Sequence, residues 1–188
     1  AGYAVERQEF TAEGRACYNL AVERRGMGRP EEIVVVGAHY DSVIGSPGAN
    51  DNGSAVAAAL ALARRFSREQ TQKTVRFVWF ANEEPPYYHT ESMGSLVYAK
   101  RCKAAKEKVT AMLSLETIGY YSDEEGSQKY PFPFSWFYPS KGNFLGFVSN
   151  VASRKLLHEV IRSFRQHCAF PSDGGAIPSV ITGVNWSD

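Results

Sequence analysis

The stretch Ile33-Val34-Val35-Val36-Gly37-Ala38-His39-Tyr40-Asp41 joins a run of apolar, mostly β-branched residues to a histidine and an aspartate. A continuous run of this kind predicts a strand that is covered on both faces of a sheet. Similar runs at Thr74 to Phe80 and Val109 to Leu115 predict two more buried strands. Helices are expected at the alanine-rich segment Ser54 to Arg68 and at Glu91 to Lys106. This β-α-β-α-β order favours a largely parallel sheet between helices.

Strands of another kind are expected at the start of the chain. Tyr3 to Phe10 and Cys17 to Glu23 alternate apolar and polar residues, which predicts a hairpin of half-buried strands at an edge of the sheet. Tyr121 to Gly142 is rich in proline, glycine and serine and is expected to be a long loop. A strand at Phe144 to Ser149 and a helix at Ser153 to Cys168 follow. The fold class is therefore α/β, a three-layer αβα sandwich with a mixed, mostly parallel central sheet.

The composition limits the classes of function. The chain has 188 residues, of which 44% are hydrophobic, and a formal net charge of +1. This length suits one well-filled core, so a single domain is expected over 1–188. No basic run is dense enough to indicate nucleic-acid binding, and the longest apolar run, Ala55 to Ala63, is far below the roughly 20 residues of a membrane span. Cys17, Cys102 and Cys168 are too widely spaced for a disulfide framework or a cysteine zinc site. We expect no nucleic acid and no membrane among the partners.

Residues of the types that bind metals follow the buried strands or precede the first helix. They are His39, Asp41, Asp51, Glu83, Glu84 and Glu116. In an open α/β sheet, ligands bind beyond the carboxyl ends of the strands. Taken singly, each side chain has an ordinary interpretation as a solvated polar residue. Together, the carboxylates would repel one another unless a cation neutralised them, and nitrogen and oxygen donors without a thiolate suit zinc, cobalt or manganese.

The spacing within this set assigns different tasks to its members. His39 and Asp41 are two positions apart on one side of an extended segment, where the aspartate can accept the second imidazole N–H and set the tautomer. Glu83 and Glu84 are consecutive and point in different directions. One of them can therefore coordinate a metal while the other acts as a general base on water.

Four motifs in order resemble the di-zinc aminopeptidases related to bacterial leucyl aminopeptidase. The resemblance covers Tyr3 to Asp188, and the order and spacing of the motifs make it specific. The motifs are Gly37-Ala38-His39-Tyr40-Asp41-Ser42, Gly48-Ala49-Asn50-Asp51-Asn52-Gly53-Ser54, Phe80-Ala81-Asn82-Glu83-Glu84 and Leu113-Ser114-Leu115-Glu116-Thr117-Ile118-Gly119. The resemblance implies a phosphorylase/peptidase-like zinc exopeptidase fold and a peptide substrate with a free N-terminus, whose first peptide bond is hydrolysed by water activated between two zinc ions.

The resemblance also implies the ligand set. His39, Asp51 and Glu116 would hold one zinc ion, and Asp51 would share the second with Glu84 and a distal histidine. Members of the family often carry aspartate where this chain has Glu116. Of the two remaining acidic residues, Glu83 would be the general base and Asp41 would support the histidine.

One departure from the family lies at the end of the chain. The distal histidine typically follows a Ser-Asp pair, and Ser187-Asp188 are the last residues here. We therefore expect a C-terminally incomplete catalytic domain that also lacks N-terminal parts. Because only two of its residues are left for the second zinc ion, we expect this chain to bind that ion poorly and to be inactive or impaired.

Two other functions stay open. One is a glutaminyl-cyclase-like transferase, which on the same fold works with a single zinc ion. The other is a non-catalytic relic domain, against which the intact His39 and Glu83 argue. Many members of the family that this chain resembles are exported, so we expect a periplasmic or extracellular location. The oligomeric state is left open.

The remaining candidates are weaker. His89 follows Glu84 closely and is a possible neighbour of the site mouth, whereas His158 and His167 have ordinary roles on a helix. The aromatic stretch Tyr130 to Tyr138 either rims a pocket for a substrate side chain or covers the sheet.

Overall fold

The computed structural model describes residues 2–130, 136, 138–178 and 188. It comprises two compact units, one of 1–119 with Asp188 and one of 120–187, and each is described by itself. The prediction of one domain over 1–188 stays a prediction. The elements are β1 (Glu6–Ala12), β2 (Arg15–Arg24), β3 (Arg29–His39), α1 (Gly53–Phe66), β4 (Lys73–Phe80), α2 (Gly94–Ala104), β5 (Lys108–Ser114), β6 (Leu145–Ser149), η2 (Val151–Ser153), α3 (Arg154–His167) and β7 (Ser172–Ala176).

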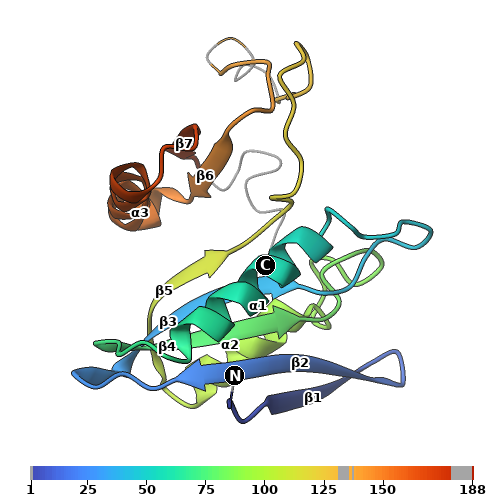
Figure 1. Ribbon diagram of the computed structural model, residues 1–188. Helices are drawn as coiled ribbons and strands as arrows, with labels where there is room; N and C mark the ends of the chain where they lie inside the picture. Colours follow the sequence, from blue (N-terminus) through green and yellow to red (C-terminus); the bar gives the residue numbers. More distant parts are fainter. Residues whose placement is uncertain (1, 131–135, 137, 179–187) are drawn as a thin grey trace. The chain divides into compact units, whose positions relative to one another are not determined.

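The first unit is a five-stranded mixed sheet with the strand order β1-β2-β4-β3-β5 (Figure 1). Strands β4, β3 and β5 are parallel, and the β1–β2 hairpin joins the sheet through an antiparallel pairing of β2 with β4. The predicted hairpin at the edge and the buried strands β3 and β4 are therefore confirmed. The third predicted buried strand, β5, is present but lies at the other edge of the sheet, and its side chains are exposed or half-buried. Strand β3 lies between β4 and β5, which brings the carboxyl ends of three parallel strands to one edge of the sheet.

One helix covers each face of this sheet, as expected for three layers (Figure 1). On one face, Tyr98 and Cys102 of α2 pack in a buried cluster with Val35 of β3. On the other face, Ala59 and Ala63 of α1 pack with Val36 and other strand residues. Successive side chains of a strand point to opposite faces, so the unbroken apolar run of β3 supplies both clusters.

Helix α1 approaches the sheet through alanines at a spacing of four residues, Ala55, Ala59 and Ala63. Larger side chains of the same helix, Leu60 and Leu62, are exposed.

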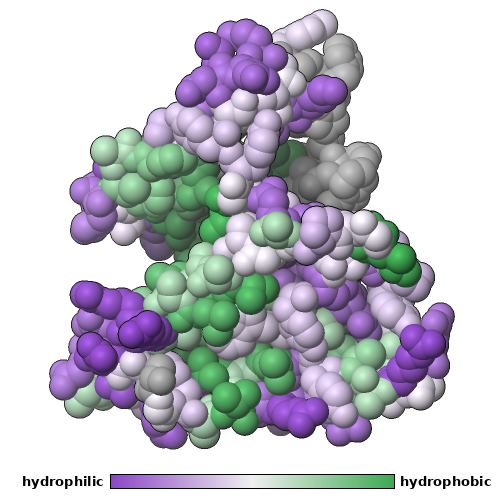
Figure 2. Space-filling view, turned by 45° about the vertical axis from the view of Figure 1, so that its right-hand side comes forward, coloured by the Kyte–Doolittle hydropathy of each residue, from purple (hydrophilic) through white to green (hydrophobic). Residues whose placement is uncertain are grey.

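Figure 2 shows hydrophobic residues interspersed with hydrophilic ones over one face of the molecule. None of the described helices combines the length and the apolar character needed to span a membrane.

The second unit pairs β6 with β7 in parallel and packs α3 against them through the buried Leu157 and Ile161. Strand β7 was not predicted, because its sequence Ser-Asp-Gly-Gly-Ala lacks β-branched and aromatic residues. Its Gly174 lies so close to the backbone of Phe147 that a Cβ would overlap the carbonyl oxygen. No strand or α-helix is assigned to the described part of 121–142, and much of the aromatic stretch Tyr130 to Tyr138 lies outside the described residues.

The start of α2 is tied to the end of β4 through a glycine. Gly94 donates its N–H to the carbonyl oxygen of Ala81 (2.9 Å), and its own carbonyl accepts from Asn19 Nδ2 (2.8 Å). Asn19 Oδ1 in turn accepts from the N–H of Ala81 (3.1 Å). A Cβ on Gly94 would overlap both the Ala81 oxygen and the Asn19 side chain, so only glycine fits here.

We predict that Gly94→Ala lowers the free energy of unfolding by about 2–3 kcal/mol, because the added methyl group forces the helix away from the strand end. The matched control is Gly146→Ala in β6, where the nearest atom to a new Cβ is 3.8 Å away. This control is expected to change stability by no more than about 0.5 kcal/mol. Urea denaturation measures both, and an equal change in the two variants would contradict the prediction.

Candidate metal centre

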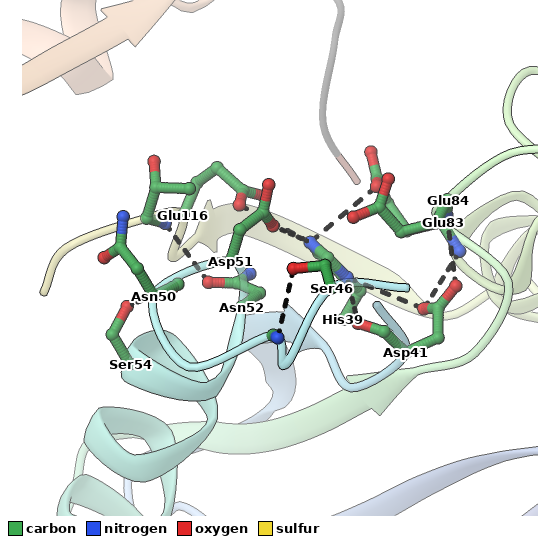
Figure 3. A network of polar contacts seen from close by, with 12 residues as sticks. His39, Asp41, Ser46, Asn50, Asp51, Asn52, Ser54, Glu83, Glu84 and Glu116 are labelled. Atoms are coloured by element: carbon green, nitrogen blue, oxygen red, sulfur yellow. Dashed lines mark hydrogen bonds and ion pairs between the residues drawn. The ribbon is translucent and has the colours of Figure 1, made fainter. Parts of the chain in front are cut away.

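His39 is the last residue of β3, and its side chain is 0% exposed. The ring nitrogen Nδ1 lies 3.2 Å from the carbonyl oxygen of Asp41 and 3.5 Å from its Oδ1. These two acceptors orient the imidazole and direct Nε2 toward the edge of the sheet, as Figure 3 shows. The support of His39 by Asp41 stays a prediction, for which these two distances are the structural basis.

The Nε2 atom of His39 faces three carboxylates that come from different parts of the chain. It lies 3.2 Å from Asp51 Oδ1, 3.4 Å from Glu116 Oε1 and 3.7 Å from Glu83 Oε2. The atom is buried and makes no hydrogen bond among the described residues. Burial acts to lower the pKa of His39, but the adjacent carboxylates of Asp41 and Glu116 outweigh it and raise this pKa to about 11. At this pKa the metal-free protein keeps the imidazole protonated among the carboxylates, and a metal ion can take the place of that proton at Nε2.

The donor atoms lie close enough together to share an ion. His39, Asp51 and Glu84 each offer one ligand atom, and these atoms lie within 4.8 Å of one another. Burial raises the pKa of Asp51, and the charge of Glu116 adds to the rise. No lysine or arginine of the described residues forms an ion pair with Asp51, Glu83 or Glu84. Nitrogen and carboxylate donors of this kind fit zinc.

Glu83 and Glu84 follow β4 in a turn that begins with Asn82 at a φ of 61°. Asn82 holds this left-handed conformation with a hydrogen bond from its Nδ2 to the carbonyl oxygen of Ser92 (3.2 Å). Glu83 is 7% exposed, and burial raises its pKa to about 7. A carboxylate with such a pKa is suited to accept and return a proton near neutral pH.

Asp41 fixes the same turn from the other side. Its Oδ1 accepts from the N–H of Glu83 (3.2 Å) and its Oδ2 from the N–H of Glu84 (3.1 Å). Burial acts to raise the pKa of Asp41, but the hydrogen bonds from His39 and from the two backbone N–H groups lower it below its usual range. Asp41 therefore orients the imidazole and the pair of glutamates at the same time.

The structure brings together all six residues that the sequence singled out, namely His39, Asp41, Asp51, Glu83, Glu84 and Glu116 (Figure 3). Their roles as ligands and base stay predictions. His158 and His167 lie in α3 and contact Arg154 Nε and the carbonyl oxygen of Ser163, as expected for ordinary helix residues. The exposed His89 stacks on Tyr88 with ring centroids 4.1 Å apart.

The neutral side chains that hold the site were not predicted from the sequence. Asn19 and Asn52 are each 1% exposed and bond backbone groups next to the glutamates. For Asn19 the sequence does offer an indication. It is a polar residue among apolar ones, at a strand position whose side chain is expected to point into the core. Asp188, the second residue of the Ser-Asp pair, is grouped with the first unit, and burial raises its pKa to about 7.

A buried histidine that faces carboxylates at the carboxyl edge of a mixed α/β sheet is an arrangement that suits a divalent metal ion. The chain belongs to peptidase family M28, whose family model matches residues 19–146. The predicted relation to zinc exopeptidases is thereby confirmed.

Relatives and solved structures agree with this family. The chain is 32% identical to the protein YfbL of Escherichia coli (strain K12), covering 100% of this chain and 59% of that protein. It is 39% identical to an aminopeptidase of Pseudomonas aeruginosa, covering 54% of this chain and 18% of that protein. The chain therefore spans less than two thirds of the relatives' length.

Among solved structures, a zinc aminopeptidase from Bacillus subtilis is 32% identical with a TM-score of 0.51, covering 62% of this chain and 28% of that chain. A glutaminyl cyclase from an Acidobacteriales bacterium shares the fold with a TM-score of 0.61 at 16% identity, covering 93% of this chain and 57% of that chain. The α/β fold predicted from the sequence is thus confirmed, and the zinc aminopeptidase neighbour supports zinc as the metal.

We predict that Asp41→Asn lowers the affinity for zinc about tenfold or more. An amide has one oxygen to accept with, so its NH₂ group would face one of the two N–H groups of the Glu83–Glu84 turn. Titration of the metal-free protein in competition with a chromogenic chelator measures the affinity. Asp123→Asn, an exposed aspartate of the second unit, is the control and is expected to bind as the unmodified protein does. Unchanged affinity in Asp41→Asn would show that the turn does not need this carboxylate.

Proposed function

We propose that this chain carries the catalytic carboxylates of a zinc aminopeptidase, which hydrolyses the first peptide bond of peptides with a free N-terminus. The observation that carries the proposal is the buried Nε2 of His39, which lacks a hydrogen-bond partner among the described residues and faces carboxylates that follow β4 and β5 and precede α1. Membership of a peptidase family supports peptides as the substrate class.

The chain offers donors to two ions. His39, Asp51 and Glu116 would hold the first, because two carboxylate oxygens lie within 3.4 Å of the imidazole nitrogen. Asp51 would bridge to the second ion, for which Glu84 is the further ligand from this chain. The exposed position of Asp51, whose side chain is 52% exposed, suits a carboxylate that binds on both of its oxygens.

Bound zinc supplies a Lewis acid that lowers the pKa of water and polarises the scissile carbonyl group. Glu83 would take the proton from the attacking water and return it to the departing amine. In the metal-free protein, burial raises the pKa of this glutamate to about 7, which shows that its surroundings favour uptake of a proton. Asp41 holds the main chain of this glutamate, so the position of the base depends on the same carboxylate that orients the histidine.

A glutaminyl-cyclase-like transferase is the second candidate, since a cyclase shares the fold. A peptide with N-terminal glutamine separates the possibilities. An aminopeptidase releases free glutamine and a peptide that is one residue shorter. A cyclase instead releases ammonia and leaves a peptide that ends in pyroglutamate, and a non-catalytic domain yields neither product. Release of ammonia without free glutamine, by zinc-loaded protein, would replace the first proposal by the second.

We predict that Glu83→Gln lowers the rate of release of the N-terminal residue by about 10²–10⁴-fold, because the amide cannot accept the proton. Zinc content, measured by elemental analysis, is expected to stay as in the unmodified protein, since this glutamate is assigned no place among the ligands. Glu31→Gln changes an exposed glutamate of the same sheet and serves as the control with unchanged rate. If Glu83→Gln releases the N-terminal residue at a rate within threefold of that of the unmodified protein, Glu83 is not the general base.

A further inference from the structure

The loop that carries Asp51 is bonded to the segment that carries Glu116 through neutral side chains. Asn52 donates from Nδ2 to the carbonyl oxygen of Leu115 (2.9 Å) and accepts at Oδ1 from the N–H of Thr117 (3.1 Å). These two groups belong to the peptide bonds on either side of Glu116. One side chain therefore holds both peptide planes that set the direction of this glutamate.

Two further side chains, Asn50 of the loop and Ser54 in the first turn of α1, extend this contact. Ser54 Oγ accepts from the N–H of Ile118 (3.1 Å), and Asn50 Oδ1 accepts from the N–H of Gly119 (2.8 Å). A Cβ on Gly119 would lie 2.8 Å from Ser54 Cβ and 2.9 Å from Asn50 Oδ1, so the two segments are in close contact. Figure 3 shows Asn50, Asn52 and Ser54 beside the chain that bears Glu116.

The contact opposes an electrostatic force. Asp51 and Glu116 both approach His39 Nε2, at 3.2 Å and 3.4 Å, and their charges repel. Asn52 is 1% exposed, so its hydrogen bonds are made away from water, where they are electrostatically stronger than at the surface. Because Asn52 directly follows Asp51, it fixes the main chain of one carboxylate relative to the other.

We propose that Asn52 is a positioning residue that holds Glu116 opposite Asp51, and so prepares the zinc site before the metal binds. The inference rests on the proposed function, because zinc is taken to occupy the site. The amide supplies one donor and one acceptor without a charge. Leucine of nearly the same size supplies neither, and serine is too short to reach both peptide groups.

The test compares Asn52→Leu with a control variant, Thr74→Val. The control residue Thr74 matches Asn52 in burial and in the number of its hydrogen bonds. Thr74 is also 1% exposed, donates from Oγ1 to the carbonyl oxygen of Pro30 (2.7 Å) and accepts from the N–H of Gly26 (3.1 Å). It lies near the start of β4, whereas the site lies beyond the end of that strand. Both variants lose one donated and one accepted hydrogen bond, so both are expected to be destabilised without metal.

The first readout is zinc affinity by competition with a chromogenic chelator. Asn52→Leu is expected to bind zinc about tenfold or more weakly than the unmodified protein, and Thr74→Val within twofold of it. The second is the visible absorption of bound Co²⁺, expected to change in Asn52→Leu alone. Asn52→Ser introduces a smaller polar side chain and is expected to show the same loss of zinc affinity. If the leucine variant does not fold, the zinc affinity of Asn52→Ser tests the positioning role.

Three results would overturn the inference. Zinc affinity in the Asn52 variants within twofold of the unmodified protein would remove Asn52 from the positioning role and leave the proposed function intact. Equal weakening in Thr74→Val would show that the effect is one of general stability. Failure of the unmodified protein to bind zinc would overturn both the inference and the proposed function.

Discussion

Repulsion among carboxylates around a buried imidazole is the constraint on which the site depends. Asp51, Glu83 and Glu116 all lie within 3.7 Å of His39 Nε2, and burial raises the pKa values of Asp51 and Glu83. In the metal-free protein a protonated His39 offsets part of this repulsion, and the fold fixes the main chain of each member. The sheet provides this fixation, because the carboxyl ends of β3, β4 and β5 lie at one edge.

Strand ends alone do not determine where a side chain points, and here each acidic segment has its own hydrogen-bond partner. Asp41 accepts from both backbone N–H groups of the Glu83–Glu84 turn. Asn52 bonds the peptide groups on either side of Glu116. Asn19 bonds Ala81 and Gly94 and so connects the end of β4 with the start of α2.

Those features that local patterns encode could be predicted from the sequence. The apolar runs of β3 and β4 identify buried strands, and the acidic residues that follow the strands were recognised because strand ends are where α/β proteins bind ligands. The roles of Asn19 and Asn52 were missed because their partners lie more than 60 positions away along the chain, and no local pattern shows which peptide group a distant amide meets. Strand β7 was missed for a related reason, since its glycines are required by close approach to β6 rather than by β-propensity.

The chemistry of these partners explains why two of them are amides. A lysine or arginine at position 52 would neutralise the neighbouring carboxylates and compete with a metal ion for them, whereas another carboxylate would add to the repulsion. An amide bonds both a carbonyl and an N–H group and leaves the negative charge at the site unchanged. Asp41 is the exception, and it faces the imidazole Nδ1 and two N–H groups, all of which favour a negative charge at that position. The negative charge of the remaining carboxylates is thus left for a cation, although the chain as a whole carries a formal net charge of only +1.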